Sequence, residues 1–173
     1  MQNESIQINL SSISSQFSGK LDFTFIASND GSVHLRIYAF DPKDLRKSGI
    51  HLMLSDSKYQ SFKDIVTNID ETIKKLKQSG KIHKMLATYS KSKSVSIDFG
   101  SINSYSGQIS FSVITFSNKN GHLQIFAHDP SDLRKSGVLL HCSQSEFDKL
   151  RNVIKRTDEL LVSKQVKKLT SGL

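Results

Sequence analysis

One stretch of this chain occurs twice, and that repeat limits the available folds more than any other feature of the sequence. FDPKDLRKSGI occupies residues 40–50, and HDPSDLRKSGV occupies residues 128–138, 88 positions later. GKLDFTFI (19–26) matches GQISFSVI (107–114) at the same offset. The repeated unit is therefore longer than a loop motif, and it corresponds to a whole structural module.

The two copies fill almost the entire chain. Upstream of the first match, SIQINL (5–10) faces SVSIDF (94–99) at an offset of 89. Two units of about 80 residues are too few and too large for a solenoid, which needs at least three short repeats. We expect a pseudo-dimer instead, in which each half covers the apolar face of the other.

Each half is predicted to form four strands followed by one helix. In VHLRIYAF (33–40), aliphatic side chains alternate with polar or aromatic ones, and HLQIFAH (122–128) repeats the phase. This period of two is typical of a half-buried strand. After the last strand of each half, apolar residues recur every three or four positions in segments 59–76 and 147–161. That spacing predicts amphipathic helices.

The expected fold class is α+β, with two tandem β-β-β-β-α repeats whose curved antiparallel sheets are backed by two helices. Residues 1–78 and 94–173 are the predicted repeats, which together form one globular unit. The Lys- and Ser-rich segment 79–93 reads as a solvated linker. Ser143 and Glu146 have the spacing of a capping box at the start of the second helix.

Composition narrows the classes of partner. The chain carries 24 Lys and Arg against 16 Asp and Glu, a formal net charge of +8, which favours nucleic acid or another anionic surface. Cys142 is the only cysteine, so an intrachain disulfide is excluded and a reducing compartment is expected. No apolar run approaches the roughly 18 residues of a membrane helix, and no secretion signal is evident. We therefore expect a cytoplasmic, nucleoid or nuclear protein.

One run of residues also suggests a family. DPKDLRKSGIHLMLSDSKYQSFKDIVTNIDETIKKL (41–76) resembles the single-stranded-DNA-binding core of the transcriptional coactivator family called positive cofactor four. The shared order is a strand ending in Asp-Pro, a short basic loop, Gly-apolar-x-Leu, and a helix with an early aromatic residue. SEFDKLRNVIKRTDELL (145–161) ends a second, weaker match. Two fused copies make the chain similar to Whirly and mitochondrial guide-RNA-binding proteins.

The resemblance implies binding of unpaired DNA or RNA across the curved sheet, and pairing of chains through the helices into a dimer or tetramer. The residues favour the same chemistry, because stacking on aromatic rings and cations along the phosphates need no particular base sequence. The third strands contribute three aromatic candidates and one cation, namely Tyr38, Phe40, Phe126 and Arg36. The resemblance adds two helix-start aromatics and the basic loop: Tyr59, Phe147, Arg46, Lys47, Arg134 and Lys135.

The hairpin after the second strand departs from the family pattern. The family has an aromatic residue and two lysines around a glycine there. The turns of this chain read SNDGS and SNKNG, in which Lys119 is the only cation. Affinity or strand preference is expected to differ accordingly.

Each candidate has a plainer interpretation. The aromatic rows of the third strands are also suited to an interface with another subunit or with the other half. Tyr59 and Phe147 lie in phase with the apolar stripes of their helices, which suits core anchors. In the basic loop, Gly49 and Gly137 suit unusual backbone angles, and the cations suit simple solvation.

A metal centre and a catalytic site have little support. Five histidines fall on strand positions facing away from the core: His34, His51, His122, His128 and His141. No metal-ligand spacing accompanies them, so contacts to bases are the favoured interpretation. The aspartates beside the two prolines, Asp41, Asp44, Asp129 and Asp132, suit turn capping better than a divalent ion. No cofactor is predicted.

The sequence therefore predicts a non-enzymatic protein that binds single-stranded DNA or RNA, with DNA favoured over RNA, and with little sequence specificity. Transcription, replication and repair all employ such proteins. Two alternatives remain open. The first is a protein-interaction scaffold or transcriptional cofactor that uses the same aromatic face, and the second is a metal-dependent phosphodiesterase.

Overall fold

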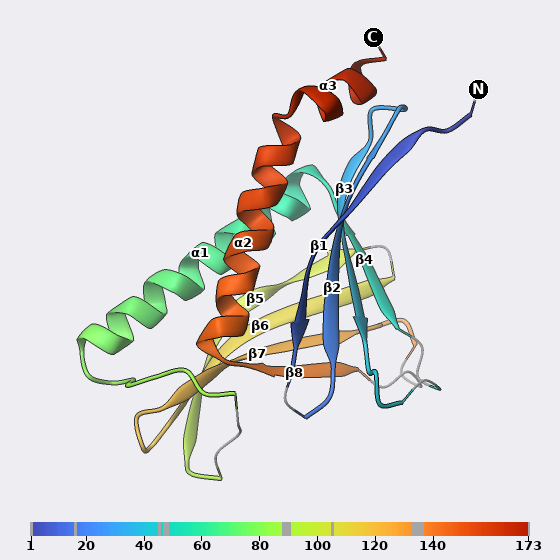
Figure 1. Cartoon of the computed structure of the whole chain (residues 1–173). Coiled ribbons are helices and arrows are strands. Elements are labelled where there is room, and N and C mark those ends of the chain that lie inside the picture. The colour runs from blue at the N-terminus through green and yellow to red at the C-terminus, as the bar shows by residue number, and fades with distance from the viewer. Residues whose placement is uncertain are drawn as a thin grey trace.

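The described part of the chain folds as two four-stranded antiparallel sheets with three helices, which confirms the predicted α+β class (Figure 1). The structure is a computed structural model, and it describes residues 2–15, 17–44, 46, 49–87, 91–104, 106–132 and 137–172. The first half contains β1 (Ser5–Ser14), β2 (Lys20–Ser28), β3 (Val33–Phe40), β4 (Ile50–Leu54) and α1 (Asp56–Gln78). The second half contains β5 (Ser94–Ser104), β6 (Gly107–Phe116), β7 (Gly121–His128), β8 (Val138–Cys142), α2 (Gln144–Leu161) and α3 (Lys164–Ser171).

The two sheets are meanders of the same design. Their strand orders are β1-β2-β3-β4 and β5-β6-β7-β8, and each edge strand β1 and β5 carries one irregularity, at Asn9/Ser11 and Asp98/Gly100. These bulges are 89 positions apart, whereas the later strands are 88 apart. The offset changes in the first hairpin of each half. Five residues lie between the paired residues Ser14 and Lys20, whereas four lie between the equivalent pair, Asn103 and Gln108. One hairpin loop is thus one residue longer in the first half.

The predicted alternation of buried and accessible residues is observed. In β3, Leu35, Ile37 and Ala39 are buried, whereas the residues between them are partly accessible. The buried side chains point toward the helices, and the other face of the sheet is left open. We call this second surface the open face of each sheet.

Each helix packs against the sheet of the other half. α1 lies along β5, and α2 lies along β1. Arg156 of α2 donates from Nη1 to the carbonyl of Leu10 at 3.0 Å, and Glu146 accepts the backbone N–H of Ser14 at 3.0 Å. Figure 1 shows α1 and α2 crossing on the same side of the two sheets. The halves are therefore interlocked, as expected of a pseudo-dimer.

A single apolar core spans both halves. The ring of Phe62 in α1 lies between two equivalent residues, Phe23 of β2 at 6.2 Å and Phe111 of β6 at 6.1 Å, measured between ring centroids. All three side chains are almost completely buried. Since burying a phenylalanine contributes about 1.5–3 kcal/mol, these three rings alone tie the halves together strongly.

The sheets also meet at their ends. Ser104 Oγ accepts the backbone N–H of Met53 at 2.8 Å and donates to the Met53 carbonyl at 3.1 Å. At the equivalent place in the other half, the N–H of His141 donates to Ser15 Oγ at 3.2 Å. Gly107 allows this approach, because a Cβ there would lie 2.8 Å from Ile50 Cγ2. The first hairpin of each half, β1–β2 or β5–β6, is thus hydrogen-bonded to the last strand of the other sheet.

Three details differ from the sequence interpretation, and the first is the capping box. Ser143 precedes α2, but its side chain makes no cap hydrogen bond. Its hydroxyl lies 2.9 Å from Ser145 Oγ, and the carboxylate of Glu146 bonds Ser14 and Lys149. The capping-box prediction was wrong because contacts with β1 and with the next turn of the helix engage Glu146.

The second detail concerns the connector 79–93, and the third is the additional helix α3, since only one helix was predicted in each half. Ile82 and Met85 are buried, and Leu86 donates its N–H to the carbonyl of Gly121 at 2.7 Å. The first part of the connector is thus docked on the second half instead of solvated. The lysines at 164–168 belong to α3, whose Val166 is buried and whose N-cap Ser163 accepts the Val166 N–H at 3.3 Å.

Among the helices of the described residues, none has the length and apolar content needed to cross a membrane.

Candidate nucleic-acid interface

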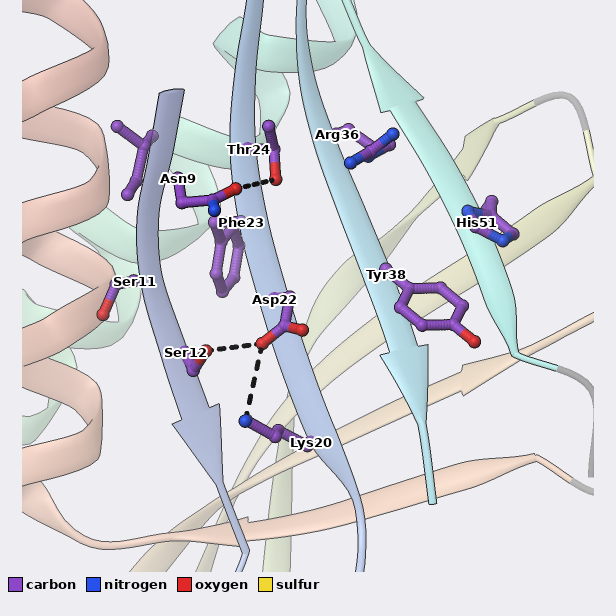
Figure 2. A pocket seen from close by; sticks show the side chains of 11 residues that line it. Asn9, Ser11, Ser12, Lys20, Asp22, Phe23, Thr24, Arg36, Tyr38 and His51 are labelled. Atoms are coloured by element: carbon purple, nitrogen blue, oxygen red, sulfur yellow. Dashed lines mark hydrogen bonds and ion pairs between the residues drawn. The ribbon is translucent and has the colours of Figure 1, made fainter. Parts of the chain in front are cut away.

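The open face of each sheet is hollowed at an equivalent position. In the first half a pocket of about 450 Å³ lies over β1 to β4, and in the second half one of about 480 Å³ lies over β5 to β8. The first is lined on its open-face side by Asn9, Ser12, Lys20, Asp22, Thr24, Arg36, Tyr38 and His51 (Figure 2). The second is lined by Ser96, Asp98, Ser110, Ser112, Gln124, Phe126 and Leu139. The repeat therefore creates two related concave surfaces.

A row of rings lies on the first of these surfaces. Tyr38 stacks on Phe40, with ring centroids 5.0 Å apart and planes at 17°, and on His51, at 4.4 Å and 25°. Offset stacking of this kind fixes ring orientation and contributes about 0.5–1.5 kcal/mol beyond burial. The three side chains are only partly buried or exposed. They form a pre-ordered aromatic surface that a base could extend.

The glycine of the repeated loop motif makes room for this row. A Cβ on Gly49 would lie 2.0 Å from Tyr38 Cε2, and one on Gly137 would lie 2.2 Å from Phe126 Cε2. Both rings therefore rest directly on the backbone just before the next strand, β4 or β8. Neither glycine has a positive φ. The requirement for glycine is thus the close approach of a ring, and the interpretation through unusual backbone angles is corrected.

The second surface keeps part of the row. Phe126 stacks on His128 at 5.0 Å with planes at 16°, in the same arrangement as Tyr38 with Phe40. Leu139 occupies the position equivalent to His51. The predicted candidates Tyr38, Phe40 and Phe126 are thus all on the open faces, where sequence periodicity placed them.

Cations accompany the first row. Arg36, a predicted nucleic-acid-binding residue, lines the first pocket, and Lys20 lies 5.8 Å from the centroid of the Phe40 ring. Lys20 also lies 3.9 Å from the carboxylate of Asp22, with both side chains partly exposed. Sequence reasoning missed Lys20 and Asp22, although both alternate with Leu21 and Phe23 and so had the period that identifies this face.

Two histidines of the second sheet are less accessible than the sequence suggested. His122 is completely buried beside Phe116 and lies 2.8 Å from His141, measured Nε2 to Nδ1. Burial, with a smaller contribution from His141, lowers the pKa of His122 to about 4. Burial also lowers the pKa of His141. His122 is therefore a neutral, internal side chain with no surface to offer a base, contrary to the expected contact.

Phe17 is a further aromatic that the sequence analysis missed. It lies in the hairpin between β1 and β2, is half exposed, and meets the ring of His141 edge-on at 6.1 Å. Its carbonyl accepts a hydrogen bond from Lys43 Nζ at 2.7 Å. An aromatic residue of the first half thus packs at the border of the second sheet. An aromatic residue in a polar turn, SQFSG, was the available signal.

The helix-start aromatics are not on the open faces. Phe147 is fully buried, and Tyr59 is almost so. The Tyr59 hydroxyl donates to Asp158 Oδ1 at 2.8 Å, and burial together with this carboxylate raises the pKa of the phenol. Both rings are buried, so the geometry favours their interpretation as core anchors, and Tyr59 also joins α1 to α2.

The basic loop is described only in part. The guanidinium of Arg46 is highly exposed and lies 3.3 Å from Asp44. Lys47, Arg134 and Lys135 lie outside the described residues. Lys119 is exposed at the tip of the β6–β7 hairpin, with φ of 64°, and does not line either pocket.

The aspartates of the loop stabilise turns. Asp41 Oδ1 accepts the N–H of Lys43 at 2.9 Å, and Asp129 Oδ1 accepts the N–H of Ser131 at 3.0 Å. This confirms the capping interpretation for both residues. Among the described residues, no group of three or more His, Cys, Asp or Glu side chains is arranged to hold a metal ion.

Comparisons of the chain with protein-family models, with curated proteins and with solved structures find no match.

Proposed function

We propose that this protein binds single-stranded nucleic acid, DNA in preference to RNA, through the open faces of its two sheets. The observation that carries the proposal is the aromatic row seated on a glycine, which occurs in both halves. A ring held flat against a strand loses little further freedom when a base stacks on it. Base–aromatic stacking contributes about 1–3 kcal/mol for each base and tolerates any sequence.

Charge supports the same function. The formal net charge of +8 favours a polyanion, and Lys20 and Arg36 lie beside the first aromatic row. Cations next to stacking rings are the combination that proteins use to follow an unpaired strand. The resemblance to positive cofactor four and to Whirly proteins points to the same ligand.

The proposed protein binds its ligand without catalysis. It acts in transcription, replication or repair, in the cytoplasm, nucleoid or nucleus, and it self-associates through its helices into a dimer or tetramer. All exposed residues of α1 are polar or charged. Association through this helix would therefore depend on polar contacts, and salt would weaken it.

The first test is fluorescence anisotropy of a labelled single-stranded oligonucleotide of mixed sequence, with its duplex as competitor, from low to physiological salt. We expect salt-sensitive binding that the duplex does not displace. Absence of binding at low salt would overturn the proposal. It would favour the rival function, a protein-interaction scaffold that uses the same aromatic surface. Metal-dependent loss of the oligonucleotide would indicate a phosphodiesterase.

A matched pair of variants separates the open face from general charge. Lys20→Gln with Arg36→Gln changes the first face to the residues that the second half carries, and should lower the logarithmic salt slope by about 0.7 for each phosphate contact that is lost. Lys74→Gln with Lys75→Gln removes the same charge from the outer face of α1. The second pair should leave the slope unchanged, and equal slopes in both double variants would exclude the open face.

The aromatic row has its own variant. Replacing Tyr38, Phe40 and Phe126 by Ala should weaken binding by the loss of stacking on each ring, about 1–3 kcal/mol for each base that loses its platform. The fold is checked by thermal unfolding. A folded triple variant with unchanged affinity would remove these rings from the mechanism.

A further inference from the structure

The two open faces have diverged in chemistry although their backbones correspond. At four equivalent positions the first face carries a charged residue or histidine and the second an uncharged one: Lys20 and Gln108, Asp22 and Ser110, Arg36 and Gln124, and His51 and Leu139. If both faces only held phosphates, a carboxylate on the first would be unfavourable. Its presence in the pocket with two cations needs a different explanation.

Asp22 is held in a defined orientation. Its Oδ1 accepts a hydrogen bond from Ser12 Oγ and lies 3.9 Å from Lys20 Nζ. Figure 2 shows the second carboxylate oxygen pointing across the sheet toward Tyr38. In the part of the chain that the structure describes, neither contact of this carboxylate involves Oδ2. An acceptor is therefore presented on the floor of the pocket.

Arg36 presents donors in the same pocket. In the strand register, Asp22 lies opposite Tyr38 and Thr24 lies opposite Arg36. Asp22 and Arg36 are thus diagonal neighbours, a spacing of about 7–8 Å between such positions. Thr24 donates to Asn9 Oδ1 at 3.2 Å, and no ion pair joins Arg36 to another described residue. An acceptor and a forked donor therefore flank the space beside the Tyr38 ring.

We propose that this pocket recognises a guanine base of the bound strand; the proposal rests on the function proposed above. A ligand between Asp22 and Arg36 must offer N–H donors to the carboxylate and acceptors to the guanidinium. Guanine offers two adjacent donors, N1–H and the 2-amino group, next to the acceptors O6 and N7, to which arginine binds in bidentate fashion. Thymine and uracil offer one N–H between two carbonyls. Adenine and cytosine offer a single amino group as donor beside a ring-nitrogen acceptor, so neither has two adjacent donor groups for the carboxylate and two acceptors for the guanidinium.

The carboxylate also argues against a phosphate in this position. A phosphodiester next to Asp22 would place two negative charges in one pocket, whereas a neutral base would be attracted to both partners. The base would stack on the aromatic row while its edge lies over β2 and β3. The second face, with Ser110 and Gln124 in these positions, would accept any base. The protein would thus combine one selective and one permissive surface.

The test uses the full chain and oligothymidines that differ at one central base: guanine, hypoxanthine, adenine, cytosine or thymine. Competition anisotropy should favour guanine by about tenfold, the discrimination typical of a good bidentate contact. Hypoxanthine, which lacks the 2-amino group, should lose most of this preference. Equal affinity for all five strands would refute guanine recognition by this pocket while leaving the proposed function intact.

Variants then assign the preference to this pocket. Asp22→Ser and Arg36→Gln, each introducing the residue of the second half, should abolish the preference for guanine, measured for each variant as the ratio of its affinities for the guanine-containing strand and for plain oligothymidine. Asp22→Asn, which keeps the shape of the side chain, serves as a second variant should Asp22→Ser unfold. Ser110→Ala and Gln124→Ala should leave the preference unchanged. A preference that survives Asp22→Asn or Arg36→Gln would refute the assignment, and failure to bind any strand would refute both proposals.

Discussion

The buried His122 should make the folded protein lose stability in mild acid. Its side chain is completely buried, and burial followed by the neighbouring His141 lowers its pKa from 6.5 to about 4. Because the folded-state pKa is the lower one, the unfolded chain binds the proton first as the pH falls. The stabilisation is therefore complete above pH 6.5 and is lost progressively as the pH falls toward 4.

The magnitude follows from the same values. Each pKa unit corresponds to about 1.4 kcal/mol, so the fall from 6.5 to about 4 removes about 3 kcal/mol from the free energy of unfolding. That is a large share of the 5–15 kcal/mol typical of a domain. Carboxylates throughout the chain also titrate in acid, so a comparison between variants is needed to isolate His122.

Urea unfolding of the wild type and of His122→Gln, from neutral pH to a pH of about 4, measures this contribution. Gln can still bond His141 and does not titrate. Its free energy of unfolding should fall by about 3 kcal/mol less than that of the wild type over this range. His83→Gln, at an exposed position, should behave like the wild type. Parallel losses in the wild type and His122→Gln would refute the reasoning.

Three further predictions concern how the halves are joined. Tyr59→Phe removes the hydrogen bond to Asp158 and should cost about 1 kcal/mol in urea unfolding of the wild type but little in Asp158→Asn, a comparison in which the Lys63–Asp158 ion pair cancels; additive losses would contradict this coupling. Gly107→Ala, whose Cβ would lie 2.8 Å from Ile50 Cγ2, should cost about 1–3 kcal/mol, and an unchanged thermal midpoint would contradict it. Cleavage at a protease site placed in 88–90 should leave two fragments that co-elute and unfold in one transition, because α1 packs on β5 and α2 on β1; separation in native buffer would contradict it.

The internal repeat made most of the fold predictable. A repeated segment with a period of two fixes which residues of a strand share a face, and β3 follows that pattern from Val33 to Phe40. The repeat also shows which residues of the two halves are equivalent. The positions of Tyr38 and Phe126 on the open faces could therefore be predicted from alternation alone. Helix periodicity was equally informative, since Phe62, Ile69 and Ile73 of α1 are buried as expected.

Periodicity shows that a face is buried, but it does not identify what covers that face. The sequence therefore did not reveal that each helix lies along the other half's sheet, or that the hairpin containing Phe17 reaches His141. The capping prediction failed for the same reason, because Glu146 bonds Ser14 of the other half. The burial of Ile82 likewise depends on a distant partner, Gly121, which no local pattern in a Lys- and Ser-rich segment identifies.

Fusion of the two halves explains why the open faces can differ. In a symmetric homodimer, any substitution on one open face appears on both, so a carboxylate such as Asp22 would enter both surfaces at once. Within a single chain the two copies vary independently, while the shared core around Phe62 keeps them together. The residues that differ, Lys20, Asp22 and Arg36 against Gln108, Ser110 and Gln124, lie on the open face and line or border its pockets. By contrast Gly49 and Gly137, which seat the rings, are the same in both halves. This pattern is expected if ring stacking is needed on both surfaces and cations are needed on one.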